Sequence, residues 1–317
     1  MRYQLYGLVI DFDGVLSGVQ SADNRHVDIR AQRGTFSKPF STPSEWFMYW
    51  HFPDGELWLS CAKVNGGYLL RFNKLADFFL SEKGTQITYL PKPGIPSETT
   101  HHLLLDQVIP LVINLRGGEA LHVSAILTPN GVAAFAGPAG SGKSTLAGAL
   151  FNRGYPMVSD DCLALMEKNK GIYAIPAYPG LRLWGDTLDY LFGDKGSHKS
   201  VAHYTDKRRL EIEKITGTYC TEPQSLKRLY TIADSTVVNG KVNVLIERLS
   251  SQESFMALVK CAFRLDITDP HMLKRQFHFL ERAASRISVR CLSFTRDFNL
   301  LPAVREAILK DLQDLEN

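Results

Sequence analysis

The stretch Gly137-Pro138-Ala139-Gly140-Ser141-Gly142-Lys143-Ser144 decides how the rest of the chain is interpreted. It matches the pattern GxxxxGK[ST] in full. In that pattern, backbone N–H groups surround a β-phosphate, the lysine reaches the β- and γ-oxygens, and the hydroxyl binds Mg²⁺. A glycine-rich turn can carry these letters by chance, but the apolar run 132–136 predicts a strand before the loop and residues 145–153 predict a helix after it. The sequence therefore predicts that residues from Gly137 to Thr145 bind ATP with Mg²⁺.

Two aspartates, Asp160 and Asp161, follow a short apolar run at Met157 and Val158. If that run is a strand, both carboxylates lie at its end, beside the place where the phosphate loop also ends. One carboxylate can hold Mg²⁺, directly or through water, while the other accepts the proton of an attacking hydroxyl. Taken alone, the two residues are more simply interpreted as a solvated Asp-Asp turn.

The spacing of these parts resembles the HPr kinase/phosphorylase family. The similar segments are residues 121–125, 134–147, 153–154 and 158–161. In that family a histidine precedes the first glycine of the loop by fifteen residues and an Asp-Asp pair follows its serine by sixteen, as His122 and Asp160 do here. The resemblance implies that Asp160 is the catalytic base, that His122 supports it, and that Lys143 neutralises phosphate charge. It also implies that Ser144 and Asp161 lie on the metal side.

The kinases associated with lasso-peptide biosynthesis resemble the chain over more of its length, at residues 6–8, 102–110 and 178–184 as well. This likeness implies a serine kinase whose acceptor is a serine of a ribosomally made precursor peptide, for instance its C-terminal serine. The chain departs from the HPr kinases at their second signature, a glutamate within a Glu-Ile-Arg-Gly run. Arg182 can take the arginine's place, but the nearest acidic residue is Asp186, so the second metal contact and any phosphorylase activity stay open.

Other functions compete with this interpretation. Residues 8–16, with Asp11 and Asp13, resemble the first motif of haloacid-dehalogenase-type phosphatases, in which the first aspartate is a nucleophile and the second a general acid. That chemistry needs further motifs on a repeated α/β scaffold, whereas the residues after Leu16 predict short strands and turns, so a first strand closed by an Asp-Gly turn is favoured. A sensor or assembly ATPase without a hydroxyl acceptor, an HPr kinase and a kinase of a small serine-like metabolite also remain open.

Basic residues beyond the acidic pair are candidate contacts for the γ-phosphate or for an acidic end of the substrate. A charge run is more often a solvated face, and the same caution applies to an aromatic cluster at residues 46–52, which packing in a small β domain explains equally well. The candidate substrate contacts are Arg182, Lys207, Arg208 and Arg209.

Length and pattern predict an α/β fold of two domains. The chain has 317 residues, of which 44% are apolar, which is ample for a core. Short alternating segments predict a β-rich N-terminal domain over residues 1–96, ending in a proline-containing connector. Residues 97–317 then form the P-loop kinase domain, which by resemblance is of the HPr-kinase type, similar to phosphoenolpyruvate carboxykinase.

Composition narrows the partners and the compartment. The net charge of +3, with scattered basic residues, does not favour nucleic acid as a partner. Five separated cysteines without a CxxC pair fit a reducing cytoplasm better than a disulfide framework or a zinc site. Acidic residues interrupt the first apolar stretch and no run of about 18 apolar residues follows, so we expect neither a signal peptide nor a membrane span. A homo-oligomer is possible, because HPr kinases form hexamers, but the different N-terminal half leaves the oligomeric state open.

Overall fold

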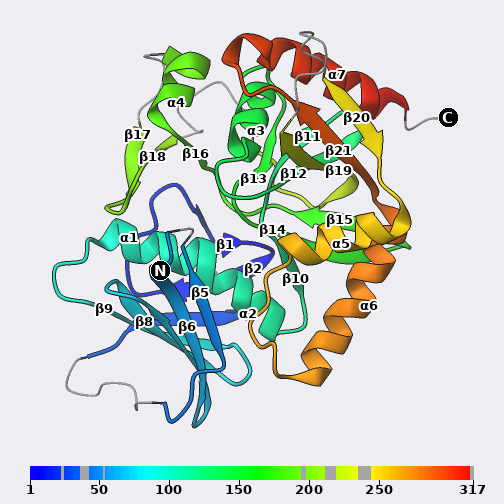
Figure 1. Cartoon of the computed structure of the whole chain (residues 1–317). Coiled ribbons are helices and arrows are strands. Elements are labelled where there is room, and N and C mark those ends of the chain that lie inside the picture. Colours follow the sequence, from blue (N-terminus) through cyan, green and yellow to red (C-terminus); the bar gives the residue numbers. More distant parts are fainter. Residues whose placement is uncertain are drawn as a thin grey trace.

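The computed structural model describes residues 1–22, 25–35, 43–52, 54–193, 198–210, 219–234 and 244–314. Two large sheets and one small sheet carry a smaller number of helices (Figure 1). The α/β class, rich in strands, is therefore confirmed. The type of P-loop domain and the boundary between residues 96 and 97 stay predictions.

The first sheet comes from the N-terminal residues, which within the described part form strands and no helix up to Pro91. Its hairpins close tightly: at Gly67, with φ of 155°, an added Cβ would lie 1.8 Å from the carbonyl oxygen of Leu80, so only glycine fits there. In spatial order the strands are β3 (Gln20–Ser21), β1 (Arg2–Leu5), β2 (Leu8–Phe12), β4 (Ile29–Arg33), β9 (Gln86–Pro91), β8 (Ala76–Ser81), β7 (Gly67–Phe72), β6 (Leu57–Val64) and β5 (Met48–His51).

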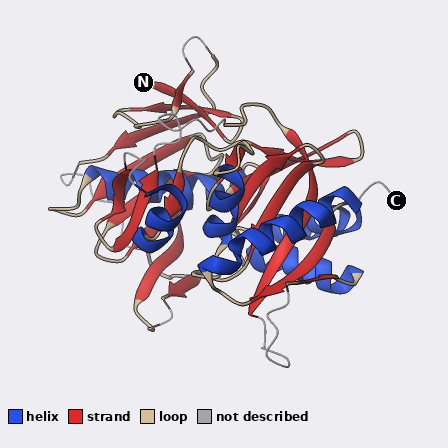
Figure 2. Ribbon diagram, turned by 90° about the horizontal axis from the view of Figure 1, so that it is seen from above, coloured by secondary structure: helices blue, strands red, loops and turns tan. Residues whose placement is uncertain are grey.

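A helical segment then lies between the two large sheets (Figures 1 and 2). It consists of α1 (Ser97–Leu103), a π-helical turn η1 (Leu104–Val108) and α2 (Ile109–Leu115). Pro110 has no N–H to donate to the carbonyl of Asp106 four residues earlier, which interrupts the α-helical ladder at this turn. The apolar residues of the segment pack into the same hydrophobic cluster as the first sheet.

The second sheet carries the phosphate loop, and its central strand separates two further hydrophobic clusters. Alternate residues of β12 point to opposite faces, Ala133 and Phe135 into one cluster and Val132 and Ala134 into the other. The strands run in the order β10 (Glu119–Leu121), β14 (Leu163–Lys168), β15 (Gly171–Ile175), β19 (Gln224–Asp234), β12 (Gly131–Ala136), β11 (Val123–Thr128) and β13 (Met157–Ser159), and β21 (Ser288–Phe294) joins β19 to β20 (Leu245–Arg248).

Helices cover both faces of this sheet (Figure 1). One cluster includes α3 (Lys143–Phe151), α4 (Gly185–Phe192) and α7 (Leu301–Gln313), the last preceded by a short 3-10 turn, η4 (Phe298–Leu300). The other includes α5 (Ser251–Cys261) and α6 (Pro270–Arg286). A small third sheet has the order β16 (Leu181–Leu183), β18 (Thr205–Leu210) and β17 (His198–Ala202).

Within the described ranges, the structure holds no helix long and apolar enough to cross a membrane.

Candidate active site

The phosphate loop lies between the end of β12 and the start of α3, as its sequence predicts. Gly142 precedes the helix in the left-handed conformation, at φ of 100°, which glycine adopts without strain. The Lys143 ammonium folds back over the loop and donates hydrogen bonds to the carbonyl oxygens of Gly137, at 3.0 Å, and Pro138, at 3.2 Å. The buried Ser141 hydroxyl has no hydrogen-bond partner in the described structure. A loop with an unpartnered hydroxyl and a lysine that donates to two of the loop's own carbonyl oxygens is suited to receive an anion.

Asp160 is held in place directly beneath the loop. Its Oδ1 accepts hydrogen bonds from the hydroxyls of Ser144, at 2.8 Å, and Ser124, at 2.6 Å. Its Oδ2 accepts one from the backbone N–H of Arg182, at 2.8 Å. The side chain has no exposed surface. Asp160 therefore connects the loop serine, the strand β11 and the start of β16 through one carboxylate.

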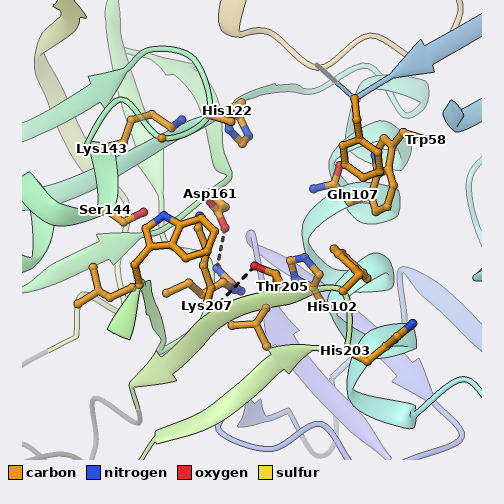
Figure 3. A pocket seen from close by; sticks show the side chains of 18 of the residues that line it. Trp58, His102, Gln107, His122, Lys143, Ser144, Asp161, His203, Thr205 and Lys207 are labelled. Atoms are coloured by element: carbon orange, nitrogen blue, oxygen red, sulfur yellow. Dashed lines mark hydrogen bonds and ion pairs between the residues drawn. The ribbon is translucent and has the colours of Figure 1, made fainter. Parts of the chain in front are cut away.

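Asp161 occupies the more accessible position of the two. It has a positive φ of 68°, which is uncommon for a residue other than glycine and costs conformational energy, so the surrounding structure must hold it there. It is 8% exposed, and its Oδ2 lies 3.6 Å from Nη1 of Arg182. Its carboxylate points into a cleft that Lys143, Ser144 and His122 also line (Figure 3).

The transfer cleft, as we name this cavity, has a volume of about 870 Å³ and two unlike walls. One wall is the phosphate loop with its neighbouring charged residues. The other comes from the first sheet and the helical segment, and includes Trp58, His102 and Gln107 (Figure 3). The tip between β17 and β18, with His203, closes part of its rim.

Most of the residues predicted from sequence meet in this cleft: His122, Lys143, Ser144, Asp161, Arg182 and Lys207 all line it. Arg208 and Arg209 are not among its lining residues. Arg209 instead donates a hydrogen bond to the carbonyl oxygen of Pro179, at 2.7 Å, and lies over the ring of Tyr178. Arg208 is exposed on β18. The roles assigned to these residues stay predictions.

Arg182 is surrounded by carboxylates rather than presented to a ligand. It is 3% exposed, and its Nη2 lies 2.8 Å from Oδ2 of Asp106, on the π-helical turn. Oδ1 of Asp106 accepts a hydrogen bond from the Tyr178 hydroxyl at 2.7 Å, and Nδ1 of His102 lies 2.8 Å from Oδ2. The sequence analysis assigns no role to Asp106 or Tyr178, although both lie in the segments 102–110 and 178–184 that resemble the lasso-peptide kinases. A further local signal is the spacing of four between His102 and Asp106, which places them on one helix face.

The charges around the acidic pair move the two pKa values in opposite directions. Burial, and then the neighbouring charge of Asp161, raises the pKa of Asp160 above its ordinary value, against the opposing effect of Arg182. Burial also acts to raise the pKa of Asp161, but the charges of Arg182 and Lys207 outweigh it and hold that pKa well below its usual range. Asp161 is therefore the permanently ionised member of the pair, and Asp160 has the higher proton affinity.

His122 lies between β10 and β11, facing the cleft beside Lys143 and Asp161 (Figure 3). Its burial, and then the charge of Lys143, lowers its pKa to about 4. Its imidazole is therefore neutral near pH 7. The hydrogen-bond partners described for Asp160 are Ser124, Ser144 and Arg182, so support of Asp160 by His122 stays a prediction.

The oxygen donors here fit a magnesium ion. Mg²⁺ prefers oxygen ligands and commonly takes one or two carboxylates beside the phosphates of a nucleotide. The Ser144 hydroxyl already lies within hydrogen-bond distance of the Asp160 carboxylate, and the ionised Asp161 lines the same cleft. No cluster of three or more acidic, histidine or cysteine side chains suited to a metal occurs among the described residues.

In the phosphatase-like motif near the N-terminus, Asp11 and Asp13 make contacts within the first sheet. Oδ1 of Asp13 accepts a hydrogen bond from the Tyr89 hydroxyl at 2.6 Å, and Oδ2 accepts one from the backbone N–H of Arg33. Asp11 lies 3.6 Å from the N-terminal ammonium. Asp13 thus joins the end of β2 to β4 and β9 within the first sheet, and neither carboxylate lines the transfer cleft.

Comparison with known proteins adds little to this geometry. No family model matches the chain, and no curated protein matches it. One similar solved structure is the Hpr(Ser) kinase/phosphatase from Coxiella burnetii, with 12% sequence identity and a TM-score of 0.34, covering 62% of this chain and 99% of that chain. A TM-score of this size carries no conclusion about activity, and the family suggested by the sequence stays a prediction.

Proposed function

We propose that the protein is an ATP-dependent kinase that transfers the γ-phosphoryl group to a serine hydroxyl of a peptide. The observation that carries the proposal is the joining of a complete phosphate loop to a buried carboxylate. The Ser144 hydroxyl, which would bind the nucleotide's magnesium ion, hydrogen-bonds to the buried Asp160, and Ser144 lines the same cleft as Asp161 and Lys143. Positioning and charge neutralisation are the main sources of catalysis in phosphoryl transfer.

The loop would bind the donor. Its backbone N–H groups and the unpartnered Ser141 hydroxyl surround the phosphates, while Lys143 exchanges the carbonyl oxygens of Gly137 and Pro138 for phosphate oxygens. Lys143 then lies where negative charge grows between the β- and γ-phosphates. Ser144 and Asp161 would hold the magnesium ion, which supplies further neutralisation of that charge.

Asp160 and Asp161 would have different roles in the transfer step. A base needs proton affinity, and the pKa of Asp160 is raised, so Asp160 would accept the proton of the attacking hydroxyl. A cation contact needs a permanent negative charge, which the lowered pKa of Asp161 provides. Asp160 is not among the residues that line the cleft and its Oδ1 accepts a hydrogen bond from Ser144, so this bond would have to break before Asp160 could meet the attacking hydroxyl.

The cleft has room for an acceptor beside the donor's phosphates, because its volume of about 870 Å³ extends from the loop to Trp58 on the first sheet. The sequence likeness, and not this volume, makes a peptide the proposed acceptor. By the resemblance to lasso-peptide kinases, the peptide would be a ribosomally made precursor phosphorylated on its C-terminal serine. This last step rests on the sequence likeness.

Transfer from γ-³²P-ATP tests the proposal. The acceptors are precursor peptides ending in serine, the same peptides ending in alanine, HPr, and free serine. We expect label on the serine peptides with the wild type, and none with Lys143→Met or Asp160→Asn. Asp11→Asn serves as the matched carboxylate control, because Asp11 lies outside the cleft and should keep full transfer.

Three other outcomes of the transfer assay would change the proposal. Label on free serine or HPr but not on the peptides would mean that the protein is a kinase with a different acceptor. ATP loss without label on any acceptor would leave an ATPase. Transfer that survives Asp160→Asn and stops with Asp161→Asn would exchange the roles of the two aspartates.

A further inference from the structure

A second cavity lies beside the phosphate loop, outside the transfer cleft. This side cavity has a volume of about 290 Å³, close to the lower limit of about 300 Å³ that is usual for ligand pockets. Residues 140–142, Thr145 and Trp184 line it as well as the cleft, so the two cavities meet at the loop and at Trp184. Lys143, Asp161 and Lys207 line the transfer cleft and are not among the residues that line the side cavity.

The direction of a bound phosphate chain follows from this difference. In a loop of this type the lysine reaches the β- and γ-phosphates, so the terminal phosphoryl group lies at Lys143. The α-phosphate lies farther from Lys143, among the backbone N–H groups that surround the α- and β-phosphates. The side cavity is lined by residues 140–142 of the loop but not by Lys143, so it offers a place for the group that is esterified to the α-phosphate.

The walls of the side cavity suit a flat aromatic ring. Trp184, 45% exposed, stands at the N-terminus of α4 and lines both cavities, with Nζ of Lys207 5.9 Å from the centroid of its ring. Phe298 of η4 also lines the side cavity. Phe298 is held in place by Tyr190, whose ring stacks on it with centroids 4.8 Å apart and whose hydroxyl donates to its carbonyl oxygen at 2.8 Å. A base can stack on such side chains whatever its hydrogen-bonding pattern.

A hydrogen bond connects the lining of the side cavity to the phosphate loop. Arg296, which also lines the cavity, donates a hydrogen bond from Nη1 to the carbonyl oxygen of Gly140 at 3.0 Å. A ligand in the side cavity would thus contact the segment that helps to hold the loop.

We infer that the side cavity is the nucleoside site, in which the base of the phosphoryl donor stacks against Trp184 and Phe298. The donor is then a nucleoside triphosphate and not an inorganic polyphosphate. This inference rests on the proposed function, because it takes the loop to bind the donor's phosphates.

Calorimetric titration with Mg-ADP and with Mg-pyrophosphate tests the inference, because only the first carries a base. We expect the wild type to bind ADP more tightly than pyrophosphate. Phe298→Ala should weaken ADP binding by about 5- to 150-fold, the loss that corresponds to the usual 1–3 kcal/mol of base stacking, and leave pyrophosphate binding unchanged. Phe277→Ala is the matched control and should change neither titration. Phe277 is an exposed ring on α6 that packs on Phe255 and does not line the side cavity.

Trp184→Leu, on another element, repeats the test if Phe298→Ala does not fold. In the wild type, Mg-ADP should also change tryptophan emission, and the change should be lost in Trp184→Phe while the other tryptophans remain. Equal effects of Phe298→Ala on ADP and pyrophosphate, or ADP binding no tighter than pyrophosphate, would overturn the inference and leave the kinase proposal standing. If neither compound binds the wild type more tightly than Lys143→Met, the proposed function itself is wrong.

Discussion

Replacing Glu119 by glutamine should change how the stability of the protein depends on pH. Glu119 lies on β10, the strand that leads into His122, and is only 1% exposed. One carboxyl oxygen accepts a hydrogen bond from Nε2 of Gln276 at 2.7 Å, while Oε1 has no partner in the described structure. Burial raises the pKa of Glu119 to about 7, against the opposing hydrogen bond from Gln276.

The size and sign of this pH effect follow from the linkage between proton binding and folding. In the unfolded chain the carboxyl loses its proton near its ordinary pKa of 4.5, whereas the folded protein keeps the proton up to about pH 7. Between these values the folded state binds more protons, so the free energy of unfolding falls as pH rises, by about 1.4 kcal/mol per pH unit. Over this window the loss reaches about 3 kcal/mol. Glutamine has no such proton to lose, so Glu119→Gln should remove this part of the pH dependence.

Urea unfolding of the wild type and Glu119→Gln at pH 4.5 and pH 8 measures the effect. The free energy of unfolding of Glu119→Gln, minus that of the wild type, should increase by about 3 kcal/mol from pH 4.5 to pH 8. Comparing the two pH values cancels any cost of the substitution that does not depend on pH. The exposed Glu306→Gln, on α7, is the surface control and should show no comparable change. A difference between wild type and Glu119→Gln that stays constant with pH would refute the idea that a neutral carboxyl is buried at this position.

Three further predictions concern the site and its surroundings. Asp106→Asn should lower the free energy of unfolding by about 3 kcal/mol in urea titrations, because the buried Arg182 loses its 2.8 Å carboxylate partner; a loss below about 1 kcal/mol would mean that Asp160 and Asp161 suffice to hold Arg182. Asp13→Asn should reduce the melting temperature, since Asp13 joins Tyr89 and Arg33, yet leave phosphoryl transfer intact; loss of transfer without loss of stability would revive the phosphatase-like interpretation. The pKa of His122, lowered to about 4, predicts stability that is complete above pH 6.5 and is lost as pH falls toward 4, and His122→Gln should weaken this acid sensitivity in unfolding experiments.

The parts of the site that are contiguous in sequence could be predicted from it. The phosphate loop needs only a strand, small residues and a helix in succession, so local pattern is enough to place residues 137–142 between β12 and α3, and residues 143–145 in the first turn of α3. For the acidic pair, the apolar run before it predicts a position at a strand's end, but the two residues alone favour a solvated turn, whereas the structure buries Asp160. The α/β class follows from the alternation of apolar residues in the strands.

The meaning of isolated charged residues could not be predicted in this way. Arg182 looks like a free cation in sequence, but the fold buries it against Asp106, which lies 76 residues earlier. Asp13 belongs to a convincing catalytic motif, yet the fold uses both of its carboxylate oxygens to join strands. A carboxylate's role depends on what the fold places within about 3 Å of it, and residue order alone does not carry that information.

The sequence by itself determined where the predicted phosphate loop lies, because the loop is made of consecutive residues between a strand and a helix. Only the tertiary structure decided what surrounds the loop. It brought Trp58 and Gln107 opposite Lys143, and it placed Phe298 near Trp184 beside the loop. These walls come from distant segments that meet because separate hydrophobic clusters pack together, and packing of that kind depends on contacts between segments that no local pattern encodes.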